Sequence, residues 1–79
     1  MKRTQLNASQ KTLLDMMGIC GSQLLRQSFC GDIRFMVYIG AKWHADVNDQ
    51  DVAKLQKLNA LRESGNGWVL TNEALRITR

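Results

Sequence analysis

The side chains in this chain that could carry out chemistry are two cysteines and one histidine, Cys20, Cys30 and His44. Cysteine nucleophiles need a base held beside the thiol, and nothing in the local sequence brings His44 to either cysteine. The three residues also lack the close paired spacing of zinc ligands. We therefore expect a protein that is not an enzyme and has no catalytic residues, metal or cofactor. Cys20 and Cys30 could form one bridge, but small secreted scaffolds carry more cysteines, so we interpret both as buried thiols.

Three aspartates, Asp46, Asp49 and Asp51, are spaced like the alternating oxygen ligands of a calcium loop. Counted from Asp46, the glycine of the sixth position and the glutamate of the twelfth are both missing. Asn48 is a good N-cap for a following helix, and acidic side chains in a first turn interact favourably with the positive end of the helix. Asp51 stands where an acid can reach back to the cap. The sequence thus favours helix capping over calcium binding.

Basic residues are a further signal. Eleven lysines and arginines against seven acidic residues give a net charge of +4, which favours polyanionic partners. The excess lies in residues 1–45, with six basic residues against two acidic ones, because residues 46–79 hold five of each. For a nucleic-acid partner, the phosphate contacts that we expect are Arg34, Lys42, Lys54 and Lys57. Lys54 and Lys57 lie along one side of a predicted helix, which would face either a groove or solvent.

An apolar and aromatic set offers a second candidate surface. Its members are Phe29, Met36, Tyr38 and Trp43. Aromatic residues and methionine are enriched at protein interfaces, so Tyr38 and Trp43, together with Met36, are the residues that we expect to contact a protein partner. In a chain of 79 residues, the same side chains are as readily explained as parts of a thin core.

The spacing of apolar residues predicts the elements that would position these side chains. Asn7 begins a capping-box pattern, and the aliphatic residues after it predict a helix over residues 8–17. Leu25 and Phe29 are four positions apart, which suggests a short second helix over residues 22–29.

Residues 33–39 alternate with a period of two and predict the best strand of the chain. One face would carry Ile33, Phe35, Val37 and Ile39, and the other Arg34, Met36 and Tyr38. This second face is only partly polar, so it is either covered by another element or offered to a partner. Residues 41–46 fit a turn or a returning strand equally well.

A second strong helix is predicted to begin after Asn48. Its apolar residues repeat every third position, at Val52, Leu55, Leu58 and Leu61. The glycines of residues 65–67 would end it, residues 68–71 would form a short strand, and residues 72–78 one helical turn.

Length and composition place limits on the protein class. Seventy-nine residues suffice for one small domain, residues 1–79, and 44% hydrophobic with 23% charged residues is typical of a soluble globular protein. No apolar run reaches the roughly 18 residues that span a bilayer, and no signal-peptide core follows the amino terminus. We expect a cytoplasmic protein that does not enter a membrane.

Three stretches, in their order along the chain, resemble small winged-helix proteins of bacteria and their phages. Residues 6–17 look like the first helix of that family, in which a leucine and a capping residue precede a glutamine and a run of aliphatics. Residues 52–61 resemble its later helix, and residues 67–74 resemble the wing strand. The resemblance implies an α+β fold with two or three helices packed on a short antiparallel sheet. It also implies a regulator of a phage or mobile element that binds double-stranded DNA through the later helix.

The chain departs from this family in ways that keep a second hypothesis open. Asp49 and Asp51 lie at the helix end that would enter the DNA groove, where carboxylates repel phosphates. Ala74 stands where the family commonly has glycine, and residues 18–45 form a long insert. The alternative is a protein-binding inhibitor of a host defence complex, such as an anti-CRISPR protein, with a nucleic-acid-binding protein complex as partner. Either function is compatible with a homodimer.

Overall fold

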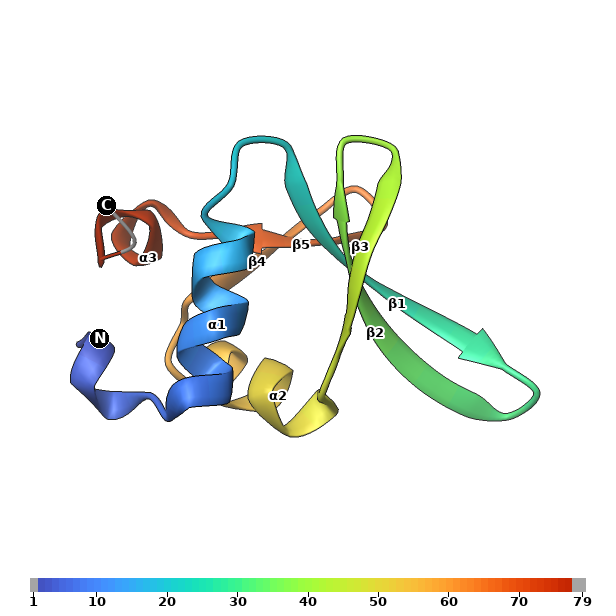
Figure 1. The fold of residues 1–79 in the computed structure, drawn as a ribbon, viewed down its shortest axis with the longest axis horizontal. Coiled ribbons are helices and arrows are strands. Elements are labelled where there is room, and N and C mark those ends of the chain that lie inside the picture. Colours follow the sequence, from blue (N-terminus) through green and yellow to red (C-terminus); the bar gives the residue numbers. More distant parts are fainter. Residues whose placement is uncertain (1, 78–79) are drawn as a thin grey trace.

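The fold is α+β, with three α-helices and one five-stranded antiparallel sheet in the computed structural model, which describes residues 2–77 (Figure 1). The fold class predicted from the sequence is confirmed. In chain order the elements are a 3-10 turn η1 (Arg3–Gln5), α1 (Ala8–Met17), β1 (Ser22–Phe29), β2 (Asp32–Ile39), β3 (Lys42–Val47), α2 (Asp49–Lys57), β4 (Leu61–Ser64), β5 (Gly67–Leu70) and α3 (Asn72–Ile77).

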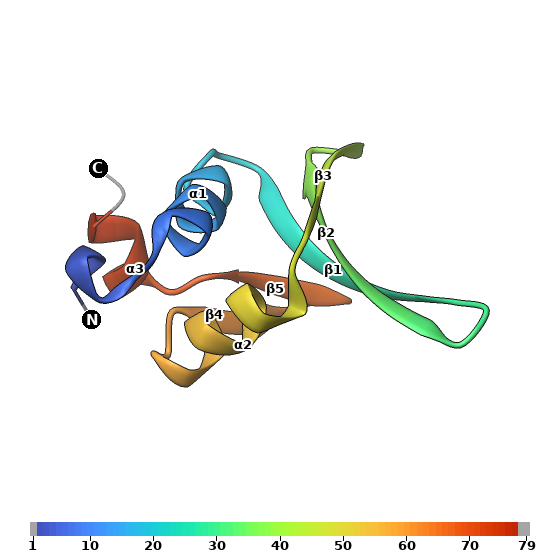
Figure 2. The ribbon, with the colours of Figure 1, turned by 60° about the horizontal axis from the view of Figure 1, so that its bottom comes forward.

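The strands lie in the order β3-β2-β1-β5-β4. β1 and β2 pair along their whole length, whereas β5 pairs with β1 only at Leu24 and Leu25. β3 joins β2 from Phe35 onward. The far end of the β1–β2 hairpin, residues 27–34, therefore extends beyond both neighbouring strands. We call it the hairpin arm, and Figures 1 and 2 show it projecting from the body of the molecule.

Both long helices begin at the predicted asparagine caps. The Asn7 side chain accepts a hydrogen bond from the Gln10 amide at 2.8 Å, and the Gln10 side chain accepts one from the Asn7 amide at 3.0 Å. Asn48 caps α2 by accepting from the Gln50 amide at 2.8 Å. Asp51 does not reach back to this cap; it accepts a hydrogen bond from the hydroxyl of Ser9 and so links α2 to α1.

The predicted helix over residues 22–29 is wrong, because this segment is strand β1. The four-residue spacing of Leu25 and Phe29 is an even number, so it places both residues on one face of a strand as well as on one face of a helix. Pairing with β2 over eight residue pairs decides in favour of the strand. Residues 41–46, which fitted a turn or a strand, belong mostly to the returning strand β3.

The second helix is shorter than predicted and ends at Lys57. Asn59 has a left-handed backbone (φ 57°), and the Ala60 amide donates to the Leu55 carbonyl at 2.9 Å, which closes the helix. Leu61 does not continue the helical stripe; it begins β4 and pairs with Leu70. The strand predicted over residues 68–71 is confirmed as β5, and the predicted terminal turn is α3, with Thr78 outside the described residues.

The core lies between the helices and one face of the sheet. Leu24 and Val37, which pair across β1 and β2, are completely buried. The fully or nearly fully buried apolar residues that join them are Leu6, Leu13, Leu14, Met17, Val52, Leu55, Ala60, Leu70 and Ala74. Helices α1 and α2, with the sheet, thus enclose one apolar cluster.

Both cysteines are free and exposed, so the prediction of buried thiols is wrong. Cys20 lies in the connection between α1 and β1, and Cys30 lies in the tight turn of the hairpin arm. Cys30 and Gly31 both have left-handed backbones, with φ of 50° and 89°. This is the geometry of a two-residue type I′ turn, which matches the twist of the strands that it joins and holds its residues away from the core.

Candidate functional site

The sheet has a second face, whose side chains lie outside the apolar cluster between the helices and the sheet. Because side chains alternate along a strand, the residues that flank Leu24 and Val37 point away from the helices. We call this the outer face; over β1, β2 and β3 the pairing assigns to it Gln23, Leu25, Gln27, Phe29, Asp32, Arg34, Met36, Tyr38, Trp43 and Asp46. None of these residues belongs to the apolar cluster or to the side chains packed against it.

The outer face brings together the three residues that the sequence suggested for a protein partner. Tyr38 lies directly opposite Trp43 across β2 and β3, and Met36 lies between Asp46 in β3 and Leu25 in β1. The placement of Met36 and Tyr38 on one face follows the period of two that predicted the strand. A β-bulge between Val37 and Tyr38 shifts the register and sets Trp43 beside Tyr38.

The core interpretation of the aromatic set fails for Phe29 and Trp43. Trp43 is 56% exposed and Phe29 is 49% exposed, whereas Met36 is buried and Tyr38 is half-buried. Large aromatic side chains with half their surface in water are costly to leave uncovered. Phe29 and Trp43 therefore leave apolar surface open to solvent on this face.

Charged side chains hold both exposed aromatic rings. The indole Nε1 of Trp43 donates a hydrogen bond to a carboxylate oxygen of Asp46 at 3.1 Å, which fixes one edge of the ring. The guanidinium carbon of Arg34 lies 6.0 Å from the centre of the Phe29 ring, within the range of a cation–π contact. Arg34 has no salt bridge to a carboxylate among residues 2–77, so its charge is available to a partner.

The four residues predicted to contact phosphates do not share one surface. Arg34 lies on the outer face, and Lys42 pairs with Ile39 at the other end of β2, about 17 Å away at the usual rise of a strand. Lys54 and Lys57 belong to α2, in the helical layer. The outer face itself has a formal net charge of −1, since Arg34 is accompanied there by Asp32 and Asp46.

The side chains that the sequence offered for catalysis or metal binding do not form a metal site. His44, Cys20 and Cys30 are all exposed. Within residues 2–77, no three histidine, cysteine or acidic side chains gather as a metal site. In the same part of the chain, no helix is both long enough and apolar enough to cross a bilayer.

The resolved pKa shifts also lie away from the outer face. Two hydrogen bonds of 2.8 Å join the guanidinium of Arg3 to the carboxylate of Asp15. These bonds raise the pKa of Arg3 and lower the pKa of Asp15. Both side chains are exposed, so this ion pair is a surface contact between η1 and α1.

Sequence reasoning included Phe29 in the aromatic set but missed Leu25, which lies at the centre of the outer face, beside Met36. The available signal was the Cys-Gly pair at residues 30 and 31, which separates this segment from the next strand as a hairpin turn would. The helical spacing of Leu25 and Phe29 obscured this signal.

Comparison of the chain with protein-family models, curated proteins and solved structures gives no significant match. The winged-helix resemblance therefore stays a prediction from sequence. The segment that it treats as an insert, residues 18–45, supplies β1, β2 and most of β3, including almost all of the outer face.

Proposed function

We propose that this protein is a non-enzymatic binding module that docks on a partner protein through its outer face. The observation that carries the proposal is the cross-strand pair of Tyr38 and Trp43, on a sheet face whose side chains lie outside the apolar cluster. Tryptophan and tyrosine are the residues that most often dominate the free energy of protein binding. A module of this size that covers a surface of a larger complex acts as an inhibitor or an adaptor.

The outer face is organised before any partner arrives. The hydrogen bond from Trp43 to Asp46 and the contact between Arg34 and Phe29 restrict two large side chains. A restricted side chain loses less conformational entropy on binding, so more of its contact energy remains as affinity. The hairpin arm continues this face beyond the body of the molecule and enlarges the area that a partner can cover.

The charge of the chain favours an acidic protein as the partner. A net charge of +4 attracts an acidic surface and accelerates its approach, whereas two copies of this chain repel each other. Within the outer face, Arg34 supplies a cation for one partner carboxylate, whereas the other two charged residues, Asp32 and Asp46, suit basic side chains of that partner. Binding of double-stranded DNA is the competing hypothesis, and it would need Lys54 and Lys57, which lie on α2.

The test compares two exposed residues on opposite faces of the hairpin arm. Phe29 is 49% exposed on the outer face and Ile33 is 51% exposed on the opposite face. Wild type, Phe29→Ala, Trp43→Ala and Ile33→Ala are each used as bait in a lysate of the source cell. We expect one acidic protein that wild type and Ile33→Ala retain and that the two outer-face variants lose. Binding of that purified protein should weaken about 30-fold in Trp43→Ala and less than about three-fold in Ile33→Ala.

Two further measurements separate this proposal from folding defects and from DNA binding. Because Trp43 is mostly exposed, Trp43→Ala should change the melting temperature by less than about 4 °C. Fluorescence anisotropy with labelled duplex DNA, from about 50 to 200 mM salt, measures phosphate contacts. Tight binding that Lys54→Ala weakens with a salt slope smaller by about one, and that Trp43→Ala leaves unchanged, would overturn the proposal in favour of the DNA-binding regulator.

A further inference from the structure

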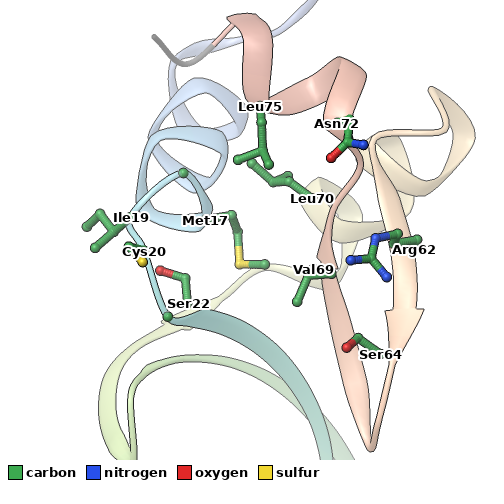
Figure 3. Close-up of a pocket in the computed structure, with 12 residues that line it drawn as sticks. Met17, Ile19, Cys20, Ser22, Arg62, Ser64, Val69, Leu70, Asn72 and Leu75 are labelled. Carbon is green, nitrogen blue, oxygen red and sulfur yellow. The ribbon is translucent and has the colours of Figure 1, made fainter.

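A pocket of 380 Å³ opens where β1 separates from β5. The two strands pair only at Leu24 and Leu25, and before Leu24 the chain turns away toward α1. One wall is formed by the end of α1, residues 18–21 and the start of β1; the other is formed by β4, β5 and α3 (Figure 3). We call this cavity the β1–β5 pocket. Its volume is at the lower end of those that hold small ligands, about 300–1,000 Å³.

The lining of the β1–β5 pocket combines an apolar side with nearly as much polar surface. Met17 and Leu70 are almost fully buried, and Val69 and Leu75 are half-buried at its sides (Figure 3). Ile19 stands at the rim with 46% of its surface exposed, which is unusual for an isoleucine that has core residues beside it. These side chains would gain burial if an aliphatic chain filled the space between them.

Among the described residues, Arg62 is the one charged residue that lines this pocket. Figure 3 shows its guanidinium turned from β4 toward the cavity. It makes no salt bridge to a carboxylate within residues 2–77, so its donors are available. Two neighbouring polar groups are already occupied, because the Ser22 hydroxyl donates to the Met16 carbonyl at 2.8 Å and the Ser64 carbonyl accepts from Gln23 Nε2 at 2.8 Å.

From this arrangement we infer that the β1–β5 pocket binds a small carboxylic acid with an aliphatic chain. The carboxylate would accept two parallel hydrogen bonds from Arg62, the geometry for which a guanidinium is suited. The aliphatic chain would lie among Met17, Val69 and Leu75. A single guanidinium balances one negative charge, and no acidic residue among residues 2–77 lines the pocket to pair with an ammonium group, so a carboxylate is favoured over an amine. The inference is independent of the proposed function.

Three probes of equal chain length and different head group test the inference: octanoate, octan-1-ol and octylammonium. Saturation-transfer NMR reports contact and isothermal titration calorimetry reports affinity. We expect octanoate to bind about ten-fold more tightly than octan-1-ol, and octylammonium to bind more weakly than both. In Arg62→Gln, octanoate should fall to the affinity of octan-1-ol while octan-1-ol itself is unchanged. Arg62→Lys, which keeps the charge but loses the paired donors, should bind octanoate more weakly than wild type and more tightly than Arg62→Gln.

Two variants control for the location of the probe. Arg76→Gln removes an exposed arginine of α3 that does not line the pocket, and Trp43→Ala removes the largest exposed apolar side chain of the outer face. Both should bind octanoate as wild type does. Equal binding of the three probes, octanoate binding that survives Arg62→Gln in a variant with the wild-type melting temperature, or loss of binding in Trp43→Ala would each overturn the inference.

Discussion

Leu24 and Leu25 are neighbours in β1, yet they lie on opposite sides of the sheet and in different surroundings. Leu24 is completely buried against the helices, whereas Leu25 is partly exposed on the outer face, beside Met36. The inner face thus holds the fold together, and the outer face presents Tyr38 and Trp43 to solvent. One set of strands can serve both purposes because successive side chains point in opposite directions.

The largest difference between the two faces is expected in stability. Leu24→Ala should lower the free energy of unfolding by about 3 kcal/mol, since it leaves a cavity in a packed core. Leu25→Ala removes the same atoms from a partly exposed site and should cost less than about 1.5 kcal/mol. Urea denaturation followed by circular dichroism measures both values. Equal losses would show that the outer face is packed as tightly as the inner one.

The second prediction concerns stability at Gly67, where β5 closely approaches β1. A Cβ atom added at Gly67 would lie 2.1 Å from the Leu24 carbonyl oxygen and 2.7 Å from Cδ2 of Leu25. Gly67→Ala should therefore cost about 2 kcal/mol, because strand backbone must move to relieve the contact. Ser64→Ala, at the position paired with Gly67 in β4, is the matched control and should change stability by less than about 0.5 kcal/mol. A Gly67→Ala variant as stable as wild type would mean that β5 can separate from β1 without loss.

A substitution in the turn of the hairpin arm should change the stability of the arm without changing that of the core. Cys30 adopts a left-handed backbone before Gly31, and Asn-Gly is the pair that this turn type favours. Cys30→Asn should stabilise the arm by about 0.5 kcal/mol. Amide hydrogen exchange should slow in residues 27–34 and stay unchanged in α1, because the turn lies at the far end of the hairpin arm (Figure 1). Slower exchange throughout the molecule would instead show that the stability of the arm is coupled to that of the core.

The smallest effect is expected from the ion pair between Arg3 and Asp15, in the helical layer. Asp15 has a lowered pKa in the folded protein, so its stabilising effect is complete above the unfolded value near 3.8 and disappears as the pH falls through the lower folded value. Asp15→Asn should lower the melting temperature slightly at neutral pH. At a pH below the folded pKa the variant and wild type should converge, and melting curves across this range measure the difference. If the difference in melting temperature between Asp15→Asn and wild type were the same at every pH, the loss of stability would come from a change within α1 and not from the loss of the charge.

Local signals in the sequence were sufficient for several elements. The caps at Asn7 and Asn48 were predicted because each hydrogen bond joins residues at most three positions apart. The two faces of β2 were predicted because alternation needs only the strand itself, so Met36 and Tyr38 could be placed together in advance. The exposed positions of Cys20 and Cys30 were not predicted, since burial depends on residues far away in the sequence.

By itself, the sequence determined where helices begin, which face of β2 is apolar, and an α+β composition of elements, since these follow from contacts within a few residues. Tertiary structure alone decided that residues 22–29 are a strand, that α2 ends before Leu61 and that Trp43 lies beside Tyr38. Each of these outcomes depends on a partner strand, because a segment with ambiguous spacing takes the conformation whose backbone hydrogen bonds and buried surface its neighbours can complete.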